Sequence, residues 1–524
     1  MKKNILTIAL IFATIGNLVI GQKVNSVTNN LKPRVIITAD PELDDNNSLI
    51  RFLLYSSDVQ VEGLVYASSQ FHWKGDGKGT KFMVPGREYT RYGLNLCPCE
   101  SYRWKKDERF IHEAVEAYEK VYNNLKVHHN GYPTPAYLKS KIKYGNIEFE
   151  GDFSKNTEGS ELIKKAILDS KPGPLYITAW GGASTIARAL KSIEDSLSAS
   201  ANWASIKKNI SVKVVLLLSG DQDNTHASYI LPNWPAMAYK QFKNGPNYGY
   251  GAQLVANKDN APLLTTAWMN EHILSKGPLG QIYRTWGDGK QMVKNDPFDY
   301  FGLDGYTNEQ LKAMGYIVWM PKQEKGSWLG EGDTGTFMNL LDNGLNAIQD
   351  GYPGGWGGRY YQPNPSKDIN PFSNDTSKVK DLVISASMLK KMDEAKEDLT
   401  EFPNFFPAAQ LDFATRMQWS VTNTYKKANH APIINTVSSL KVKAGSTIQV
   451  HASVKEPDGD QYALKWWQFS NSKKDPQLVI QEASGLYTNV QIPANLEPNQ
   501  PLFLVAEVKD QKQLTTYKTI KIEL

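Results

Sequence analysis

Four carboxylates within six residues follow the first apolar run of the chain. The apolar run 35–39 leads directly into Asp40, Glu42, Asp44 and Asp45. Like charges this close repel one another and raise each other's pKa unless a cation lies among them. Oxygen ligands of this kind suit calcium or magnesium, so the motif predicts a site for a hard divalent metal. The alternative interpretation is a solvated acidic loop at the end of a strand.

The residues that flank the carboxylates predict where they lie in the fold. Apolar positions in 46–55 recur at helical spacing, and 59–67 is typical of a second buried strand. A strand, a helix and a strand in this order form the parallel α/β unit, in which ligands collect at the carboxyl ends of the strands. The carboxylates are therefore expected at the ligand-binding edge of a sheet.

Two later segments bring acids to the same predicted edge. The mostly buried strand predicted over 212–218 is followed by Asp221 and Asp223, which we interpret as substrate-binding residues. A third acidic segment contains Asp333, ahead of a helical stretch over 337–341. Because the carboxyl ends of parallel strands meet at one edge, several acidic segments indicate a site more strongly than one does.

A glycine- and aromatic-rich loop over 350–360 carries Trp356. Glycines at this density let the backbone approach a ligand closely, so Trp356 is a candidate platform for a sugar ring. The alternative interpretation is a surface loop that is held in place by one packed tryptophan.

Composition and the amino-terminal segment bear on partners and location. The chain has 524 residues, and 59 Lys and Arg against 54 Asp and Glu give a net charge of +5. So small an excess, spread along the chain, gives no reason to expect nucleic acid as a partner. A lysine pair followed by an apolar stretch over 5–20 is typical of a secretory signal peptide, which we assign to residues 1–21. No later segment has the ~18 apolar residues of a membrane helix, so we expect a periplasmic or secreted protein without a membrane partner.

The sequence pattern changes near residue 430. Over 32–420 apolar runs alternate with helical stretches, which predicts an α/β domain with a mainly parallel open sheet. Over 430–524 only short β patterns follow, which predicts an all-β, immunoglobulin-like sandwich that folds independently. Trp466 and Trp467 are adjacent on one predicted strand and point to opposite faces. One is expected in the sandwich core and the other against the first domain or a glycan.

Two smaller motifs allow more than one interpretation. Cys97 and Cys99 form a Cys-Pro-Cys tripeptide, in which a disulfide would close a tight ring and a metal site would need two more ligands. We leave both cysteines without a role. The acids of the turn 457–460 are those of an ordinary Asp-Gly turn or of a calcium loop.

Several motifs resemble a known family. The segment 40–45 resembles the metal-binding signature of nucleoside hydrolases, usually written D-x-D-P-G-x-D-D, and 180–187 is similar to a strand–turn–helix of that family. The whole chain resembles an exported bacterial family with a nucleoside-hydrolase-like domain and a small C-terminal β-domain, described as cellulose-binding. This likeness covers nearly all of the mature chain, including 331–334, 354–360 and 429–430.

The resemblance implies a calcium ion and roles for individual residues. Asp40, Asp45 and Asp333 match carboxylate ligands of the ion, and Trp180 matches a backbone carbonyl ligand. Asp44 matches an acid that contacts sugar hydroxyls. Asp40 also matches the residue that takes a proton from the attacking water. The implied activity is calcium-dependent hydrolysis of a glycosidic bond, of the N-glycosidic kind found in nucleosides, in a small sugar-containing substrate or a glycan.

Departures from the family pattern leave a second class of function open. Thr38 replaces the first Asp of the signature, Glu42 replaces its Gly, and Gly332 stands where some nucleoside hydrolases place a leaving-group histidine. His72 and His226 lie in predicted loops at the sheet edge, and each is either a substitute for that histidine or a structural or solvated residue. The alternative function is a non-catalytic carbohydrate-binding protein, with cellulose as the ligand that the resemblance implies, that retains the hydrolase fold.

Overall fold

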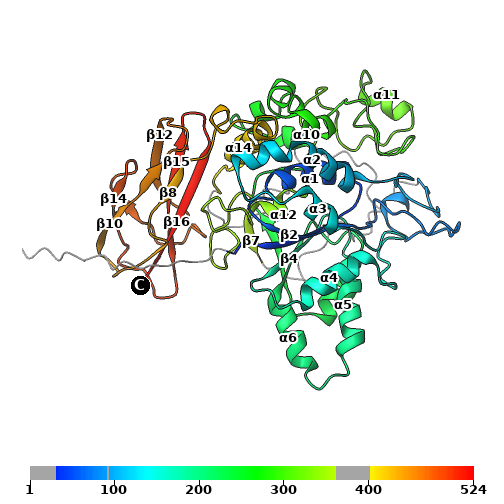
Figure 1. Cartoon of the computed structure of the whole chain (residues 1–524), viewed down its shortest axis with the longest axis horizontal. Helices are drawn as coiled ribbons and strands as arrows, with labels where there is room; N and C mark the ends of the chain where they lie inside the picture. The colour runs from blue at the N-terminus through cyan, green and yellow to red at the C-terminus, as the bar shows by residue number, and fades with distance from the viewer. Residues whose placement is uncertain (1–30, 91–93, 362–401) are drawn as a thin grey trace, which may run out of the picture. The chain divides into compact units, whose positions relative to one another are not determined.

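The computed structural model describes residues 31–90, 94–361 and 402–524. Figure 1 shows how their helices and strands are arranged. The predicted signal peptide, residues 1–21, lies outside the described residues. Among the described residues, no helix combines the length and the apolar character needed to cross a membrane.

A seven-stranded sheet in the order β3-β2-β1-β4-β5-β6-β7 organises the first part of the chain. Its neighbouring strands pair in parallel, except that β7 runs antiparallel to β6. This arrangement confirms the predicted mainly parallel open sheet. The strands are β1 (Arg34–Ala39), β2 (Gln60–Tyr66), β3 (Ile142–Tyr144), β4 (Leu175–Ala179), β5 (Val214–Leu218), β6 (Ala238–Lys243) and β7 (Arg359–Tyr361).

Helices cover both faces of this sheet (Figure 1). Ile37 packs with α1 (Leu43–Leu54), α2 (Phe110–His128) and α14 (Phe406–Ser420), whereas Ile36 packs with helices on the other face. Successive residues of a strand point to opposite faces, so β1 contributes to both layers. The helices on the second face are α4 (Glu158–Leu168), α5 (Ser184–Leu197) and α6 (Trp203–Lys213).

Shorter helices lie in the connections. The α-helices among them are α3 (Pro135–Lys141), α7 (Leu231–Asn233), α8 (Ala252–Val255), α9 (Thr266–Met269), α10 (Gly277–Ile282), α11 (Asn308–Ala313) and α12 (Gly335–Met338). The 3-10 and π turns are η1 (Glu88–Thr90), η2 (His226–Ile230), η3 (Ala261–Leu264), η4 (Asn270–Leu274) and η5 (Tyr425–Lys427).

Helix α1 begins earlier than the sequence predicts. Its first residue is Leu43 and Glu42 is its N-cap, so Asp44 and Asp45 lie in the first turn. The positive end of a helix dipole favours acidic side chains at this position. The carboxylates therefore stand directly between the carboxyl end of β1 and the amino end of α1.

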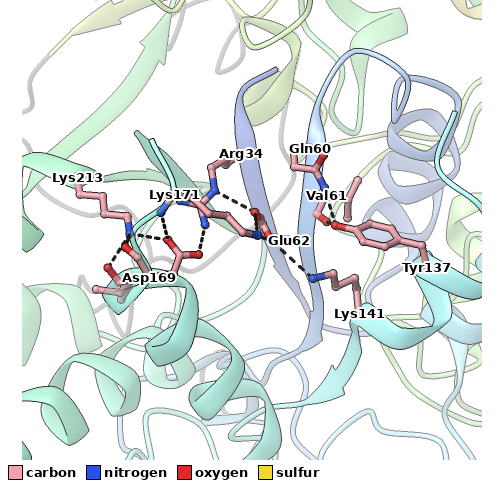
Figure 2. A network of polar contacts seen from close by, with 10 residues as sticks. Arg34, Gln60, Val61, Glu62, Tyr137, Lys141, Asp169, Lys171 and Lys213 are labelled. Atoms are coloured by element: carbon pink, nitrogen blue, oxygen red, sulfur yellow. Dashed lines mark hydrogen bonds and ion pairs between the residues drawn. The ribbon is translucent and has the colours of Figure 1, made fainter. Parts of the chain in front are cut away.

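A buried network of ion pairs occupies the opposite edge, at the amino ends of the strands (Figure 2). Arg34 contacts Glu62 at 2.9 Å and Asp169 at 2.6 Å. Lys171 reaches Glu62 at 2.7 Å, and Lys213 reaches Asp169 at 2.8 Å. Burial alone would raise the pKa of Glu62, but hydrogen bonds from Lys171 and Arg34 hold it below its ordinary value.

The carboxyl-terminal region is all-β, as the sequence predicts. Its sheets have the orders β10-β14-β13, β11-β8 and β12-β15-β16-β9, and their strands pair antiparallel except β9 with β16. The strands are β8 (Ile433–Asn435), β9 (Ser439–Lys441), β10 (Thr447–His451), β11 (Ser453–Lys455), β12 (Tyr462–Gln468), β13 (Val479–Ile480), β14 (Tyr487–Gln491), β15 (Leu502–Asp510) and β16 (Thr515–Glu523).

The two adjacent tryptophans of β12 lie in different environments, as their alternation predicts. Trp466 is 2% exposed and belongs to the core of the β-region. Trp467 packs against Phe405, just before α14, with ring centroids 6.5 Å apart. Phe405 also meets Tyr517 of β16 at 5.7 Å. Residues 32–524 form one compact unit, so Trp467 contributes to packing between its two parts.

The two cysteines form a disulfide, although the sequence left them without a role. Cys97 and Cys99 are bonded to each other. They belong to a small cluster with the buried rings of Trp73, Tyr89 and Tyr102. This cluster holds together the long connection between β2 and α2.

Candidate functional site

Three carboxylates meet at the carboxyl edge of the sheet. Asp44, Asp45 and Asp333 each place an oxygen within 4.8 Å of the others. Asp40 follows β1 directly, and its main-chain N–H donates a hydrogen bond to Asp45 at 3.1 Å. The Asp40 carboxylate itself lies against Gly181, where an added Cβ would come within 3.0 Å of it. The structure thus brings together the acids of two distant segments; we call Asp40, Asp44, Asp45 and Asp333 the aspartate cluster.

The aspartate cluster is buried, and burial dominates its electrostatics. Asp40, Asp45 and Asp333 are 1%, 2% and 3% exposed. Burial raises the pKa of Asp40, and burial together with the charge of Glu42 raises the pKa of Asp44 to about 8. Burial and the charge of Asp333 raise the pKa of Asp45 well above its ordinary value. Repulsion between the carboxylates opposes their ionisation.

Among the described residues the aspartate cluster has no ion-pair partner, and burial outweighs the charge of nearby His72, so that the pKa of Asp40 is still raised. The buried cations nearby pair with other acids. Neither carboxylate oxygen of Asp40 accepts a hydrogen bond from the described residues. A buried carboxylate without a partner is costly, and a bound cation removes that cost. The donors are all hard oxygens, so the set fits a hard divalent cation.

Gly332 and Tyr250 hold Asp44 at the side of the cluster. The main-chain N–H of Gly332 donates to Asp44 at 3.1 Å, and the Tyr250 hydroxyl donates at 3.4 Å. A Cβ at position 332 would lie 2.2 Å from a carboxylate oxygen of Asp44. Any side chain there, a histidine included, would displace Asp44 from this position.

Glu331 fixes the segment that carries Asp333. Its fully buried carboxylate pairs with Arg51 of α1 at 2.5 Å and accepts a hydrogen bond from Tyr283 at 2.5 Å. The Thr334 hydroxyl donates to the same carboxylate at 2.9 Å. The charge of Glu331 is therefore balanced by Arg51, and its contacts hold the segment in place. Of this acidic segment, only Asp333 belongs to the cluster.

The Trp180 carbonyl, the expected backbone ligand, accepts a hydrogen bond from the side-chain amide of Gln222 at 2.5 Å. A carbonyl oxygen has two lone pairs, so one remains for a cation. The indole N–H of Trp180 donates to Thr336 at 2.9 Å, which links it to the helix that follows Asp333. Sequence reasoning missed Gln222, although it lies between two of the acids that it singled out.

Asp221 and Asp223 accept hydrogen bonds from the main chain of their own loop and of a neighbouring one. Asp221 accepts a hydrogen bond from the main-chain N–H of His226 at 3.1 Å. Asp223 accepts from the N–H groups of Ser184, at the start of α5, and Thr225, at 2.9 and 3.0 Å. Acids with this local hydrogen bonding shape loops at the edge of the site. Their predicted contact with substrate stays a prediction.

His72 is buried beside Glu42. Its Nδ1 donates to the Arg103 carbonyl at 2.7 Å, and its Nε2 lies 3.5 Å from the Glu42 carboxylate. Burial lowers the pKa of His72, but its contacts with Glu42 and Asp40 outweigh this and raise it. His72 thus lies next to Glu42, the residue that departs from the family signature. Its location next to Asp40 agrees with the prediction that it lies at the site.

His226 and Trp356 do not have the environments that the predicted roles require. Burial lowers the pKa of His226 to about 4, so it is neutral near pH 7 and is not poised to protonate a leaving group. Trp356 is 2% exposed, its ring edge meets Tyr517, and its carbonyl accepts a hydrogen bond from Tyr248. A buried indole offers no face to a sugar, so the packed alternative is correct.

Comparisons with known proteins agree with this architecture. Residues 34–360 match the family described as cellulose-binding Sde182, nucleoside hydrolase-like domain. The chain belongs to this family. Residues 447–524 match the C-terminal domain of cellulose-binding protein Sde0182. No curated protein matches the chain.

The fold is similar to that of a solved nucleoside hydrolase-related hypothetical protein from Saccharophagus degradans, described as associated with carbohydrate metabolism. The two are 22% identical with a TM-score of 0.63, over 94% of this chain and 99% of that one. At this identity the likeness shows the fold alone. A chimeric titin Z1Z2 (17% identical) and murine CRIg (15%) align with 18% of this chain and with 95% and 98% of their own, each at a TM-score of 0.14.

Proposed function

We propose that the chain hydrolyses a glycosidic bond in a calcium-dependent reaction, and that the bond is N-glycosidic, as in nucleosides. The observation that carries this proposal is the buried aspartate cluster, without an ion-pair partner among the described residues, at the carboxyl edge of a nucleoside-hydrolase-like sheet. Ligands of open α/β sheets bind at this edge. The signal-peptide pattern of residues 1–21 supports a periplasmic or secreted location for the activity.

Asp40, Asp45, Asp333 and the Trp180 carbonyl would hold the calcium ion. These are oxygen donors, three of them carboxylates with raised pKa values, and positive charge among them would restore ionisation. When bound, the ion supplies Lewis acidity that makes water a better nucleophile near neutral pH.

The residues of the chain carry the remaining steps. Asp40, whose carboxylate forms no ion pair among the described residues, accepts a proton from the attacking water. The water oxygen bonds to the anomeric carbon as the glycosidic bond breaks, and the electron pair of that bond leaves with the aglycone. Asp44, less buried and held by Gly332, is placed to accept hydrogen bonds from sugar hydroxyls and to stabilise positive charge on the ring.

A panel of nucleosides and aryl glycosides tests the proposal. Wild-type protein should release free sugar from at least one substrate, stop after chelation and recover with added calcium. Asp40→Asn should lose turnover, whereas Asp221→Asn, at an acid with a local hydrogen-bonding role, should keep most of it if the protein remains folded. Turnover that continues after complete chelation would refute the calcium dependence.

A second function is supported by one specific observation. Position 332 has no room for a leaving-group histidine while Asp44 keeps its place, and His226 is neutral. A non-catalytic carbohydrate-binding protein on the same fold needs no such acid, and the family is described as cellulose-binding. Retention on insoluble cellulose by Asp40→Asn, with no turnover of any substrate by wild type, would favour this function.

A further inference from the structure

A groove of about 660 Å³ opens at the carboxyl edge of the same sheet and is formed by residues outside the aspartate cluster. Its walls come from the connections after β2 and β3 and before α2 and α4. Strands β1 and β3 lie two positions apart in the sheet, so their carboxyl ends are about 10 Å apart. The volume lies within the range of small-molecule sites, roughly 300–1,000 Å³.

Main-chain hydrogen bonds preform this groove. The N–H of Lys74 donates to Ile147 at 2.8 Å, and that of Gly75 donates to Glu148 at 2.7 Å, which joins two of its loops. The main chains of Trp73 and Tyr102 exchange hydrogen bonds at 3.0 and 2.9 Å, which joins the connection before α2 to the loop after β2. Gly75 has φ +79°, and a Cβ there would lie 1.8 Å from a backbone oxygen, so glycine is required. The groove exists without a ligand.

Tyr144 is an exposed aromatic residue in the lining of the groove. It is the last residue of β3, lines the groove and is 40% exposed. Its ring stacks on Tyr66, with centroids 4.6 Å apart and planes inclined by 16°. Tyr66 is itself fixed by a 2.8 Å hydrogen bond to His112. An exposed ring held this firmly loses little conformational freedom when a ligand stacks on it.

The charges around the groove nearly cancel. Four cationic and five acidic side chains line it among the described residues, and some are already paired, as Lys155 is with Glu148 at 2.8 Å. Arg109 pairs with Glu116 at 2.6 Å. A strongly charged ligand gains little from such a balanced wall. A ligand rich in hydroxyls gains more, because carboxylates, amides and ammonium groups supply many acceptors and donors.

We propose that this groove binds a neutral oligosaccharide, with one pyranose ring stacked on Tyr144 and neighbouring hydroxyls bonded to the polar walls. Aromatic faces suit the apolar C–H face of a pyranose, and the surrounding polar groups suit its edge. The groove shares no residue with the aspartate cluster, so this binding does not rest on the proposed hydrolysis.

Calorimetric titration with cellotetraose, xylotetraose and inosine tests the proposal on the full chain. Wild type should bind at least one tetrasaccharide. Tyr144→Ala should weaken that binding about tenfold or more, because the stacking face and its buried area are lost. Tyr144→Phe should restore it to within about twofold. Tyr306→Ala, at a tyrosine that is 43% exposed elsewhere, is the matched control and should bind like wild type.

Two further variants keep the outcome decisive. Lys106→Ala, on the exposed wall, should weaken binding while melting like wild type, so it tests the groove even if Tyr144→Ala fails to fold. Asp333→Asn should bind the tetrasaccharide like wild type, so a failure of the hydrolase proposal leaves this one intact. The proposal is overturned if no tetrasaccharide binds, if only inosine binds, or if folded Tyr144→Ala and Lys106→Ala both bind like wild type.

Discussion

The two edges of the central sheet carry acids in opposite electrostatic states. At the amino edge, Glu62 and Asp169 are each met by two or more cations, and the pKa of both is lowered (Figure 2). At the carboxyl edge, Asp45 and Asp333 meet other acids, and the pKa of both is raised. Carboxylates thus stabilise the amino edge through ion pairs and destabilise the carboxyl edge through mutual repulsion.

This difference separates an edge built for stability from an edge built for a ligand. Charges at the amino edge are neutralised within the chain, so nothing further is needed there. The aspartate cluster at the carboxyl edge has no such ion pairs among the described residues and needs a cation from outside the chain. Natural proteins tolerate this loss of stability at functional sites. Neutralising one acid should therefore have opposite effects at the two edges.

Glu62→Gln should give the largest change in stability. It leaves Arg34, 6% exposed, with only one of its two acidic partners and removes the counter-charge of Lys171. We expect a loss of roughly 3 kcal/mol in the free energy of unfolding, measured by urea denaturation. Calcium binding should be unchanged. A loss below about 0.5 kcal/mol would mean that the network does not stabilise this edge.

The pH dependence of metal-free protein should show the strain at the carboxyl edge. The pKa of Asp44 is 3.8 in its ordinary state and about 8 in the fold, so between these values the folded chain holds a proton that the unfolded chain has released. The free energy of unfolding should then fall as pH rises through this window, by roughly 2 kcal/mol. Calcium should flatten the slope. A slope that is the same with calcium and with chelator would contradict the comparison.

Asp333→Asn should stabilise metal-free protein at about pH 8, by roughly 1 kcal/mol. The substitution removes a charge that raises the pKa of Asp45, while the amide keeps a similar shape. Thermal melting in chelator, compared with Glu62→Gln under the same conditions, should show shifts of opposite sign. If both variants melt below wild type by similar amounts, the two edges do not differ as described.

Lys171→Ala should have the smallest effect. Its side chain is 53% exposed, although it contacts buried Glu62. Arg34 remains as a partner, and exposed ion pairs contribute about 0.5 kcal/mol. Urea denaturation should place this variant close to wild type and far from Glu62→Gln. A loss as large as that of Glu62→Gln would assign the network's stability to Lys171 alone.

Local signals in the sequence predicted the carboxyl edge well. A fully buried, mostly apolar strand followed by Asp40, Asp44 and Asp45 places those acids at a strand end, whatever packs around them. The acidic segment with Asp333 was also visible in the sequence, but its role as a metal ligand came from the family resemblance, because only the short helix α12 follows it. The start of α1 was missed because Glu42 caps the helix without a side-chain hydrogen bond.

Long-range packing accounts for what the sequence did not predict. The amino-edge network depends on sheet register, which sets Arg34 opposite Gln60 and Leu175 and so close to Glu62. The burial of Trp356 depends on Tyr517, a residue of the distant β-region. Neither the amino-edge ion pairs nor the burial of Trp356 can be predicted from the residue spacing within one segment.

Calcium titration of metal-free wild type, followed by calorimetry at about pH 7, tests the central comparison most directly. One ion should bind per chain and raise the melting temperature, because it supplies the positive charge that the carboxyl edge lacks. Asp45→Asn should abolish this heat, whereas Glu62→Gln, if folded, should keep it. Absence of binding by wild type at millimolar calcium, or equal binding by Asp45→Asn, would contradict the assignment of the aspartate cluster as a metal site.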